Sequence, residues 1–256
     1  MNKNIRNLII LAVLLILFTN TDSIAATAKR QYKRTVAVSG RVCLMVNTRY
    51  SDITVLPWNN RQIRIEALIT AQGRSYKEAE EFVNKILIRT AVNDTLLKAE
   101  TILPDFPIKE TDRSFWNLVF GSSHDFSVNI SFQIFVPEDT DLDITTSDGK
   151  IFIDNISGRI RAVTNGKDIE LRRMRGLVSA YTTDAKIIAD FLNIEGKGIE
   201  LTTKNGDIEF AIPEDAKITL HSESYHGSIS CELPFNKYGP FSDEEQFAWI
   251  NGGGGL

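Results

Sequence analysis

Cysteine and histidine are scarce in this chain, which has two cysteines and three histidines among its 256 residues. Cys43 and Cys231 form no closely spaced pair, and His124, His221 and His226 stand outside any His-Glu-x-x-His pattern. Structural zinc sites and zinc-dependent hydrolases need such sets of ligands. A Gly-x-Ser-x-Gly nucleophile motif is also missing. The sequence therefore contains no assembled metal-binding or hydrolytic motif, and we expect no cofactor.

An excess of positive charge is missing too. The chain has 29 basic and 33 acidic side chains, a net charge of −4, so it has no electrostatic reason to bind nucleic acid or anionic lipid. Its 43% hydrophobic and 24% charged residues are ordinary for a soluble globular protein.

The N-terminus has the order of a secretory signal peptide. Lys3 and Arg6 precede the apolar run Leu8 to Phe18, and small residues follow at 23–28. An uncleaved anchor needs about 20 apolar residues, more than this run provides. We therefore predict that residues 1–25 are a signal peptide, cleaved between 25 and 28, with no membrane span afterwards. No cysteine follows the run directly, which argues against lipid attachment.

A repeat occupies most of the remaining chain. Taking one isoleucine of each unit as position zero, apolar residues recur nine before and two after it, and a small hydroxyl recurs five before it. The isoleucines are Ile53, Ile151, Ile169, Ile187, Ile208 and Ile229. The hydroxyls are Thr48, Thr146, Thr164, Thr182, Thr203 and Ser224. The last five units follow one another at intervals of 18 or 21 residues, so this is a true repeat.

Each unit reads as two strands around a tight turn, each strand with one buried face. The turn residues include Asp148-Gly149, Asn165-Gly166 and Asn205-Gly206, types that accept the positive φ of a sharp corner. Two architectures fit: a meander of hairpins, or a solenoid in which each unit pairs with the next. The constant core positions and the threonine column favour the solenoid.

An insertion of another kind separates the first unit from the second. Ser75 and Glu78 have capping-box spacing, and we predict an amphipathic helix over about 75–89. Its apolar stripe comprises Ala79, Phe82, Val83, Ile86 and Leu87. Residues 90–102 then read as strand, turn and strand, and "FSVNISFQIFVP" returns to the sheet.

Between these strands lies a loop of about 104–125 that carries four aromatic residues. They are Phe106, Phe115, Trp116 and Phe120. Long loops on rigid scaffolds commonly carry function, so this cluster is our candidate for partner contact. The alternative is that it seals the insertion against the side of the solenoid.

Two columns of polar residues could serve as an acid/base pair or as a calcium site. The position before the zero isoleucine alternates in sign along much of the stack, through Asp52, Lys150, Asp168, Lys186 and Asp207. This pattern favours charge pairing on a solvated face over an acid/base pair. The turn oxygens of Asp148, Asp184 and Asn205 likewise favour turn chemistry over a calcium site.

The cysteines are predicted to be free thiols. Cys231 falls in the inward column, and Cys43 lies one position outside the inward Leu44. In the predicted stack they are roughly five strand spacings apart, far more than the about 7 Å that a disulfide tolerates between Cα atoms.

These features together resemble the bacterial "putative adhesin" family of β-strand-repeat domains, formerly a domain of unknown function. The resemblance spans about 36–256, and its strongest marks are "VPEDTDLDITTSDGKI" and "TTKNGDIEF". It implies an all-β fold, a right-handed parallel β-helix of T-x-N/D-G-x-I units with one inserted helix. It also implies export to the periplasm, outer envelope or cell surface, an adhesin role and no catalytic residues.

The chain ends at Leu256 after a Gly-rich stretch that in similar proteins leads into one more unit. Either the end is truncated, leaving strand edges for edge-to-edge self-association at the C-terminal unit, or "KYGPFSDEEQFAWI" covers it.

We therefore expect an exported, non-enzymatic scaffold that binds a surface, a glycan or an envelope protein. The alternatives are a periplasmic structural or sensing module with a protein partner, and a carbohydrate-active β-helix enzyme.

Overall fold

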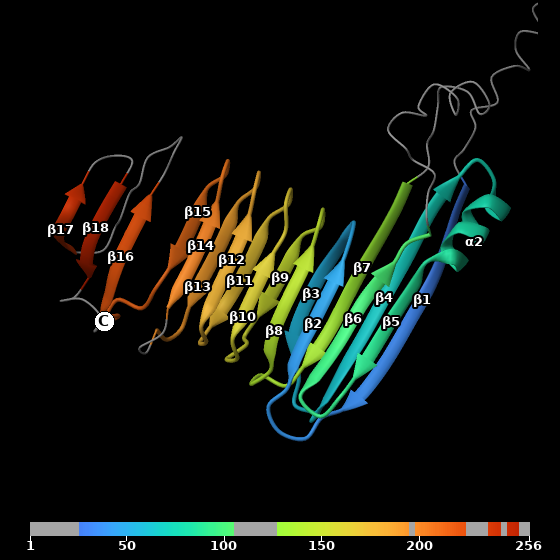
Figure 1. Cartoon of the computed structure of the whole chain (residues 1–256), viewed down its shortest axis with the longest axis horizontal. Coiled ribbons are helices and arrows are strands. Elements are labelled where there is room, and N and C mark those ends of the chain that lie inside the picture. Colours follow the sequence, from blue (N-terminus) through green and yellow to red (C-terminus); the bar gives the residue numbers. More distant parts are fainter. Residues whose placement is uncertain (1–25, 105–126, 195–197, 224–234, 242–244, 251–256) are drawn as a thin grey trace, which may run out of the picture.

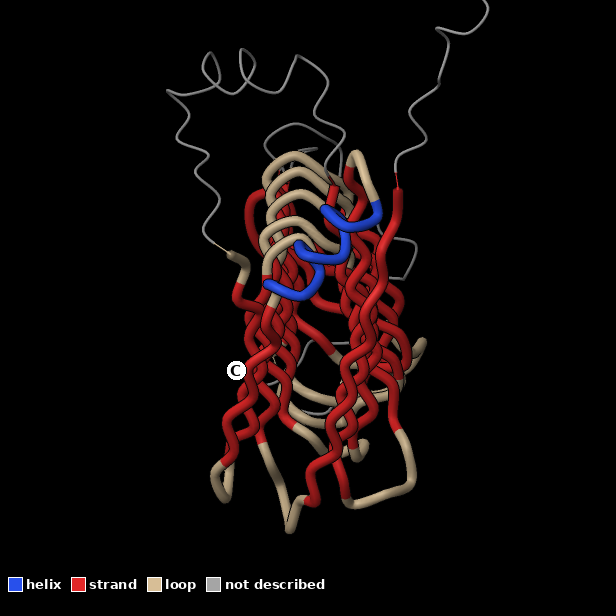
Figure 2. The backbone as a smooth tube through the Cα atoms, turned by 90° about the vertical axis from the view of Figure 1, so that its right-hand side faces the viewer, coloured by secondary structure: helices blue, strands red, loops and turns tan. Residues whose placement is uncertain are grey.

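The computed structural model describes residues 26–104, 127–194, 198–223, 235–241 and 245–250. These residues form an elongated body in which strands succeed one another along the long axis (Figure 1). Seen along that axis, the strands form two facing layers (Figure 2). The described residues are mostly β, with a single helix.

The first layer is an eight-stranded sheet. In spatial order its strands are β1 (Ala26–Ala37), β4 (Gln62–Gly73), β7 (Ser127–Val136), β3 (Ser51–Pro57), β9 (Ile151–Asp154), β11 (Ile169–Met174), β13 (Ile187–Phe191) and β15 (Ile208–Ala211). The second layer is a seven-stranded sheet. Its order is β14 (Ile199–Thr203), β12 (Val178–Thr182), β10 (Ile160–Val163), β8 (Asp141–Thr146), β2 (Cys43–Thr48), β6 (Leu96–Ile102) and β5 (Leu87–Val92).

The repeat units stack as a solenoid does. The two strands of a unit lie in different sheets, and each pairs in parallel with its counterpart in the next unit. Ile53 is opposite Ile151, and Ile169 is opposite Ile187, so the zero isoleucines form one register column. The hairpin meander is therefore wrong, and the predicted register is confirmed from the first unit to the fifth.

Burial follows the same columns. Along β9 and β13 the side chains alternate between buried and half-buried, as a strand with one face on a core requires. Ile151, Ile153 and Ile187 are at most 1% exposed. The core is thus a run of stacked aliphatic side chains between the two sheets.

The threonine column is a ladder of hydrogen bonds between coils. The hydroxyls of Thr146, Thr164, Thr182 and Thr203 each donate to a backbone carbonyl in the turn of the preceding coil, at 3.2, 2.9, 3.2 and 3.0 Å. Thr146, Thr164 and Thr182 are at most 1% exposed. Each bond satisfies a buried polar group, which explains why the same residue type recurs at this position.

Glycine recurs in the repeat turns for a reason other than the positive φ angle that the sequence suggested. Among the described residues, the positive φ angles belong to Gly40, Tyr50, Asn155 and Arg173, so the Asp and Gly of the repeat turns do not require one. Instead, a Cβ on Gly149 would lie 1.8 Å from the carbonyl oxygen of Ser51 in the preceding coil. Gly206 is similar, because a Cβ there would lie 2.0 Å from the carbonyl oxygen of Ala185. Gly149 and Gly206 are therefore needed for close approach between coils, whereas Gly166 is not.

The N-terminal third departs from the expected parallel helix. β1 pairs antiparallel with β4, β4 with β7, and β5 with β6. The sheets end in separate edge strands, so the described strands do not close into one continuous cylinder. The supported description is a solenoid-like stack of two mixed sheets.

The inserted helix is shorter than expected. α2 spans Tyr76–Lys85, and the Ser75 hydroxyl accepts a hydrogen bond from the backbone N–H of Glu78, as the capping-box spacing predicted. Ala79, Phe82, Val83 and Ile86 are buried, but Leu87 is 52% exposed. The helix ends early because Leu87 begins β5, where it alternates outward. Figure 2 shows α2 lying in front of the two layers at this end of the stack.

The first strand of the predicted sixth unit does not join the stack, and its second strand, around Ile229, lies outside the described residues. β16 (Ile218–Glu223) pairs antiparallel with β18 (Glu245–Ile250), which also pairs with β17 (Phe235–Phe241) in a separate three-stranded sheet. In the sequence, Ser222 stands at the position where earlier units have Leu201, Ala180 or Ala162, so a further coil made from this unit would bury less apolar surface. In the separate sheet, Ile218 is opposite Ile250, which is 1% exposed.

Candidate functional site

The predicted contact residues are not tested by the structure. Phe106, Phe115, Trp116 and Phe120 lie outside the described residues, as do His124, His226 and Cys231. Cys43 is half-buried, with a free thiol. The pKa of that thiol is raised by burial and by the nearby carboxylates of Asp141 and Asp143.

The alternating charges form contacts between coils. An Asp52 carboxylate oxygen accepts the backbone N–H of Lys150 at 2.9 Å, and Asp168 accepts that of Lys186 at 3.1 Å. The side chains of Lys150 and Asp168 are 3.9 Å apart, and Lys186 pairs with Glu209. These carboxylates are occupied in holding neighbouring coils together, as predicted for a solvated face.

The turn oxygens are also engaged with neighbouring coils. Asn205 donates to Asp184 at 2.6 Å, and Lys167 lies 3.6 Å from Asp148. Within the described part of the chain, no three His, Cys, Asp or Glu side chains are grouped so that they could hold a metal ion.

Asp141 is the best-paired carboxylate that the structure describes. Burial alone would raise its pKa, but hydrogen bonds from the Arg41 side chain and the Arg159 backbone N–H outweigh burial and hold the pKa below its ordinary value. With its side chain 12% exposed between two arginines, it is a structural link between coils.

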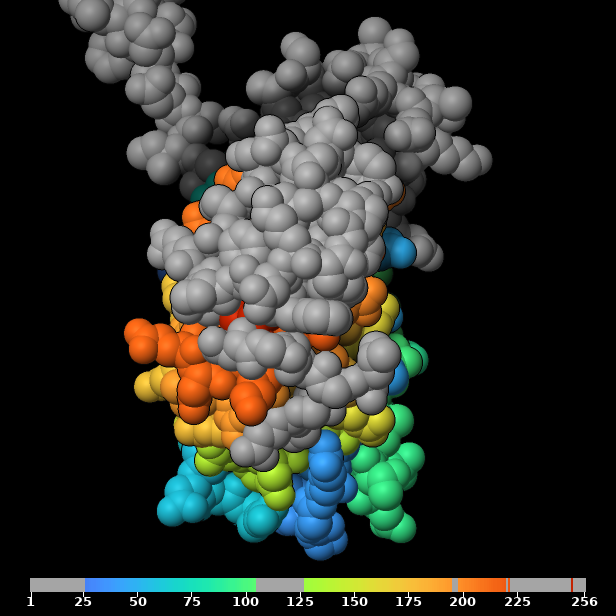
Figure 3. Space-filling view, turned by 90° about the vertical axis from the view of Figure 1, so that its left-hand side faces the viewer, coloured from blue at the N-terminus to red at the C-terminus, as the bar shows by residue number. Residues whose placement is uncertain are grey.

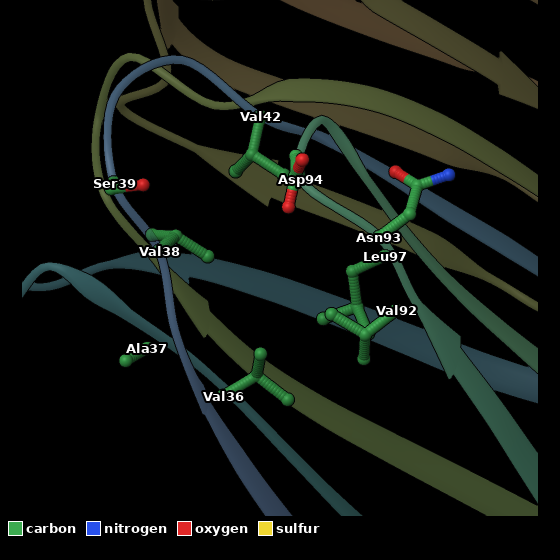
Figure 4. A pocket seen from close by; sticks show the side chains of 9 residues that line it. All are labelled: Val36, Ala37, Val38, Ser39, Val42, Val92, Asn93, Asp94 and Leu97. Carbon is green, nitrogen blue, oxygen red and sulfur yellow. The ribbon is translucent and has the colours of Figure 1, made fainter.

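One cavity of about 250 Å³ lies where the loop after β1 faces the β5–β6 turn (Figure 4). Its apolar walls include Val36, Val38, Val42 and Leu97. The turn beside it is held by Asn93, whose side-chain oxygen accepts two backbone N–H groups, of Thr95 and Leu96. This polar group is therefore already engaged in the turn.

A larger groove, of about 380 Å³, lies at the other end of the same strands. Its lining includes Asn47, Arg49, Arg89, Glu100, Thr101 and Leu103. Glu100 contacts Arg89 at 3.3 Å and Lys98 at 3.1 Å, and the hydrogen bond from Lys98 lowers its pKa. Arg49 is exposed and makes no ion pair with any acidic side chain in the described ranges. The groove therefore has a net positive charge, in a chain that is acidic overall.

Tyr50, the neighbour of Arg49, has an unusual backbone. Its φ is 53° and it is 53% exposed, whereas the same turn position holds Asp148, Gly166, Asp184 and Asn205 in later coils. The left-handed region costs about 1–2 kcal/mol for a bulky residue. Sequence reasoning missed this residue, although an aromatic side chain among turn formers was a visible signal.

The C-terminal end of the stack leaves core columns partly uncovered. Ile208 and Phe210 are 38% and 39% exposed, whereas Ile187 and Ala189, their partners in the previous coil, are at most 1% exposed. β14 and β15 are also the terminal strands of their sheets. Figure 3 views the molecule from this end, with the last coils in orange.

Comparison with known families identifies the repeat region. A family model described as Toastrack DUF4097 matches residues 122–247. This segment, 122–247, belongs to the Toastrack DUF4097 family. The resemblance noted in the sequence is confirmed, and the matched segment contains the second to fifth coils and β16.

Other comparisons are less informative. A solved structure, described as a putative cell adhesion protein from Clostridium sporogenes ATCC 15579, is 11% identical and aligns with a TM-score of 0.45. The alignment covers 73% of this chain and 100% of the other. No curated protein matches this chain. In the part of the chain that the structure describes, no helix is long and apolar enough to cross a membrane.

Proposed function

We propose that this chain is an exported, non-enzymatic interaction scaffold with an adhesin-like role. The observation that carries the proposal is the coil-to-coil bonding of its polar columns. The threonine ladder and the Asp–Lys column hold each coil to the next, and this makes the stack a rigid platform. The match of 122–247 to the Toastrack family also supports a scaffold role. We further infer that the coil is right-handed, because connections between parallel strands of one sheet are almost always right-handed.

A binding role fits these columns better than catalysis. Asp52 and Asp168 accept backbone N–H groups of the next coil, and Asp141 is held between two arginines. A glycoside hydrolase needs two carboxylates placed on either side of a bond, one of them with a raised pKa. The pKa of Asp141 is instead lowered.

Location on the cell is the property that tests this proposal. Intact cells would be treated with protease, and the fragment of residues 26–256 would be detected before and after treatment. Loss of the fragment from intact cells is the result expected of an adhesin. Protection until the outer envelope is opened would contradict a surface role.

The exposed end of the stack favours a second function, a periplasmic module that assembles through β14 and β15. Ile208 and Phe210 occupy columns that are otherwise buried, and edge strands readily accept another strand. Sedimentation of the wild type and of Phe210→Lys separates the two functions. If the wild type forms a complex that depends on concentration and Phe210→Lys does not, the result favours assembly through this end. If both proteins sediment as monomers, the assembly function is contradicted.

A further inference from the structure

The groove beside Arg49 has the features of a ligand site that the repeat architecture does not explain. Arg49 comes from the turn after β2, Arg89 from β5 and Thr101 from β6, so three separate segments converge there. Its volume, about 380 Å³, lies in the range of small-molecule sites.

Two groups in this region lack the partners that their surroundings would require. The Thr101 hydroxyl oxygen is buried and has no hydrogen-bond partner among the described residues. An unsatisfied buried hydroxyl calls for an explanation, because most such groups are paired. The Arg49 guanidinium likewise has no carboxylate partner within the ranges that the structure describes.

Tyr50 follows Arg49 in the same turn and lies next to the groove, although it is not one of the residues that line it. The two other non-glycine residues with positive φ are held by side-chain bonds: Arg173 pairs with Asp154, and Asn155 accepts a hydrogen bond from Arg175. Within the described ranges the Tyr50 side chain makes no hydrogen bond, but its turn is held by two others: the hydroxyls of Ser51 and Thr48 donate to the Arg49 carbonyl oxygen at 2.9 and 3.2 Å. A strained backbone that its surroundings hold in place, with its side chain left exposed, is typical of functional sites.

From these observations we propose that the groove binds a saccharide that carries a carboxylate, with Arg49 on the carboxylate and Tyr50, beside the groove, on the face of a sugar ring that extends past its rim. This deepens the proposed scaffold function by naming its ligand class. A guanidinium presents paired donors that match a carboxylate, and a tyrosine ring offers an apolar face with a polar edge. Asn47 and Thr101 supply further donors and acceptors for sugar hydroxyls.

An extended peptide fits this groove less well. β2 lies between β6 and β8, and β6 lies between β2 and β5, so both strands have hydrogen-bonded neighbours on each side. β5, which carries Arg89, is the terminal strand, but its free edge is on the side away from β6, whereas the groove is lined by β5, β6 and the end of β2. A peptide that binds by adding a strand needs a free edge. Recognition here depends on side chains, and this favours a compact ring.

The test is calorimetric titration of the purified mature chain with trigalacturonate. We expect saturable binding that weakens as salt is raised, and no binding of neutral maltotriose. Arg49→Ala and Tyr50→Gly should each weaken binding about tenfold or more. Tyr50→Gly should fold at least as stably as the wild type, because glycine accepts the positive φ, so a loss of binding is not a loss of fold.

Matched controls come from the fifth coil. Lys204 and Asn205 occupy the turn positions of Arg49 and Tyr50, and Lys204→Ala and Asn205→Gly should bind as the wild type does. Equal binding of hexaglutamate or inorganic phosphate would overturn the saccharide assignment. Absence of trigalacturonate binding, or equal binding by all four variants, would overturn the site.

The titration and the protease experiment fail independently. If the chain binds trigalacturonate through Arg49 but is protected from protease in intact cells, the ligand site is supported and the surface role is contradicted. If the chain is cleaved on intact cells but does not bind trigalacturonate, the surface role is supported and the ligand site is contradicted.

Discussion

The hydroxyl of Thr164 donates a hydrogen bond of 2.9 Å to the carbonyl oxygen of Gly149, one coil earlier. Thr164 is 0% exposed, so no water can replace the bond. The same hydrogen bond recurs along the stack, at Thr146, Thr182 and Thr203, so one side-chain type contributes repeatedly to the cohesion of neighbouring coils.

Replacing Thr164 by valine keeps the shape of the side chain and removes the donor. We expect the free energy of unfolding to fall by about 1–3 kcal/mol, because the Gly149 carbonyl loses its partner in a buried place. Urea denaturation measures the change. Thr202→Val, on the exposed face of β14, is the control and should change stability by less than about 0.5 kcal/mol.

Gly149→Ala tests the close approach between coils. The new Cβ would lie 1.8 Å from the Ser51 carbonyl oxygen, and we expect a loss of about 3 kcal/mol or more, because backbone must move. Gly198→Ala, where no atom lies within 4 Å, should be nearly neutral. Similar stability of the two variants by thermal unfolding would contradict the packing described here.

The Asp141 carboxylate should make stability depend on pH. Its pKa in the folded chain is lowered, so its contribution is present above the unfolded value of about 3.9 and is lost as pH falls through the folded value. Asp141→Asn should therefore be less stable than the wild type by about 1–3 kcal/mol at neutral pH.

The difference between the two proteins should shrink below about pH 4. Unfolding measured from neutral to acidic pH checks this. Asp139→Asn, whose parent side chain is 48% exposed, should show little difference, and a gap that stayed constant with pH would argue against the linkage.

Shortening a core side chain should destabilise the protein less at the C-terminal end of the stack than in its middle. Leu171 and Phe210 occupy the same column, but Leu171 is 0% exposed and Phe210 is 39% exposed. We expect Leu171→Ala to cost about 2–5 kcal/mol and Phe210→Ala about 1 kcal/mol. If chemical denaturation gave equal costs, the end would be covered in solution.

The thiols should be free and slow to react. Burial and neighbouring carboxylates raise the pKa of Cys43, so less thiolate is present near neutral pH. Alkylation of the native chain should proceed slowly at Cys43 and accelerate as pH rises. Mass spectrometry of the unfolded, unreduced chain should find two alkyl groups, whereas a disulfide would leave none until reduction.

Much of the stack could be predicted from periodicity. The column from Ile53 to Ile208 and its threonine partners specify which residues face inward and which residues pair. Alternation with period two leaves no freedom in register, since a slip by one residue would turn every apolar side chain outward. Ser75 similarly identified the start of the helix.

The groove could not be predicted in this way. Arg49, Arg89 and Thr101 are far apart in sequence, and they meet because β2, β6 and β5 are neighbours. The pairing of β1 with β4 is antiparallel and lies outside the repeat, so no periodic signal indicated it. β16 carried the repeat signal but pairs elsewhere.

By itself, then, the sequence determined the solenoid-like stack of the first five units, their register and the cap of the helix. These follow from local alternation and turn chemistry, which act over a few residues. Only the tertiary structure decided how the two sheets end, which partner β16 takes and where a positively charged groove forms. Those outcomes depend on competition between distant strands for the same backbone hydrogen bonds, and a pattern within one strand does not record that competition.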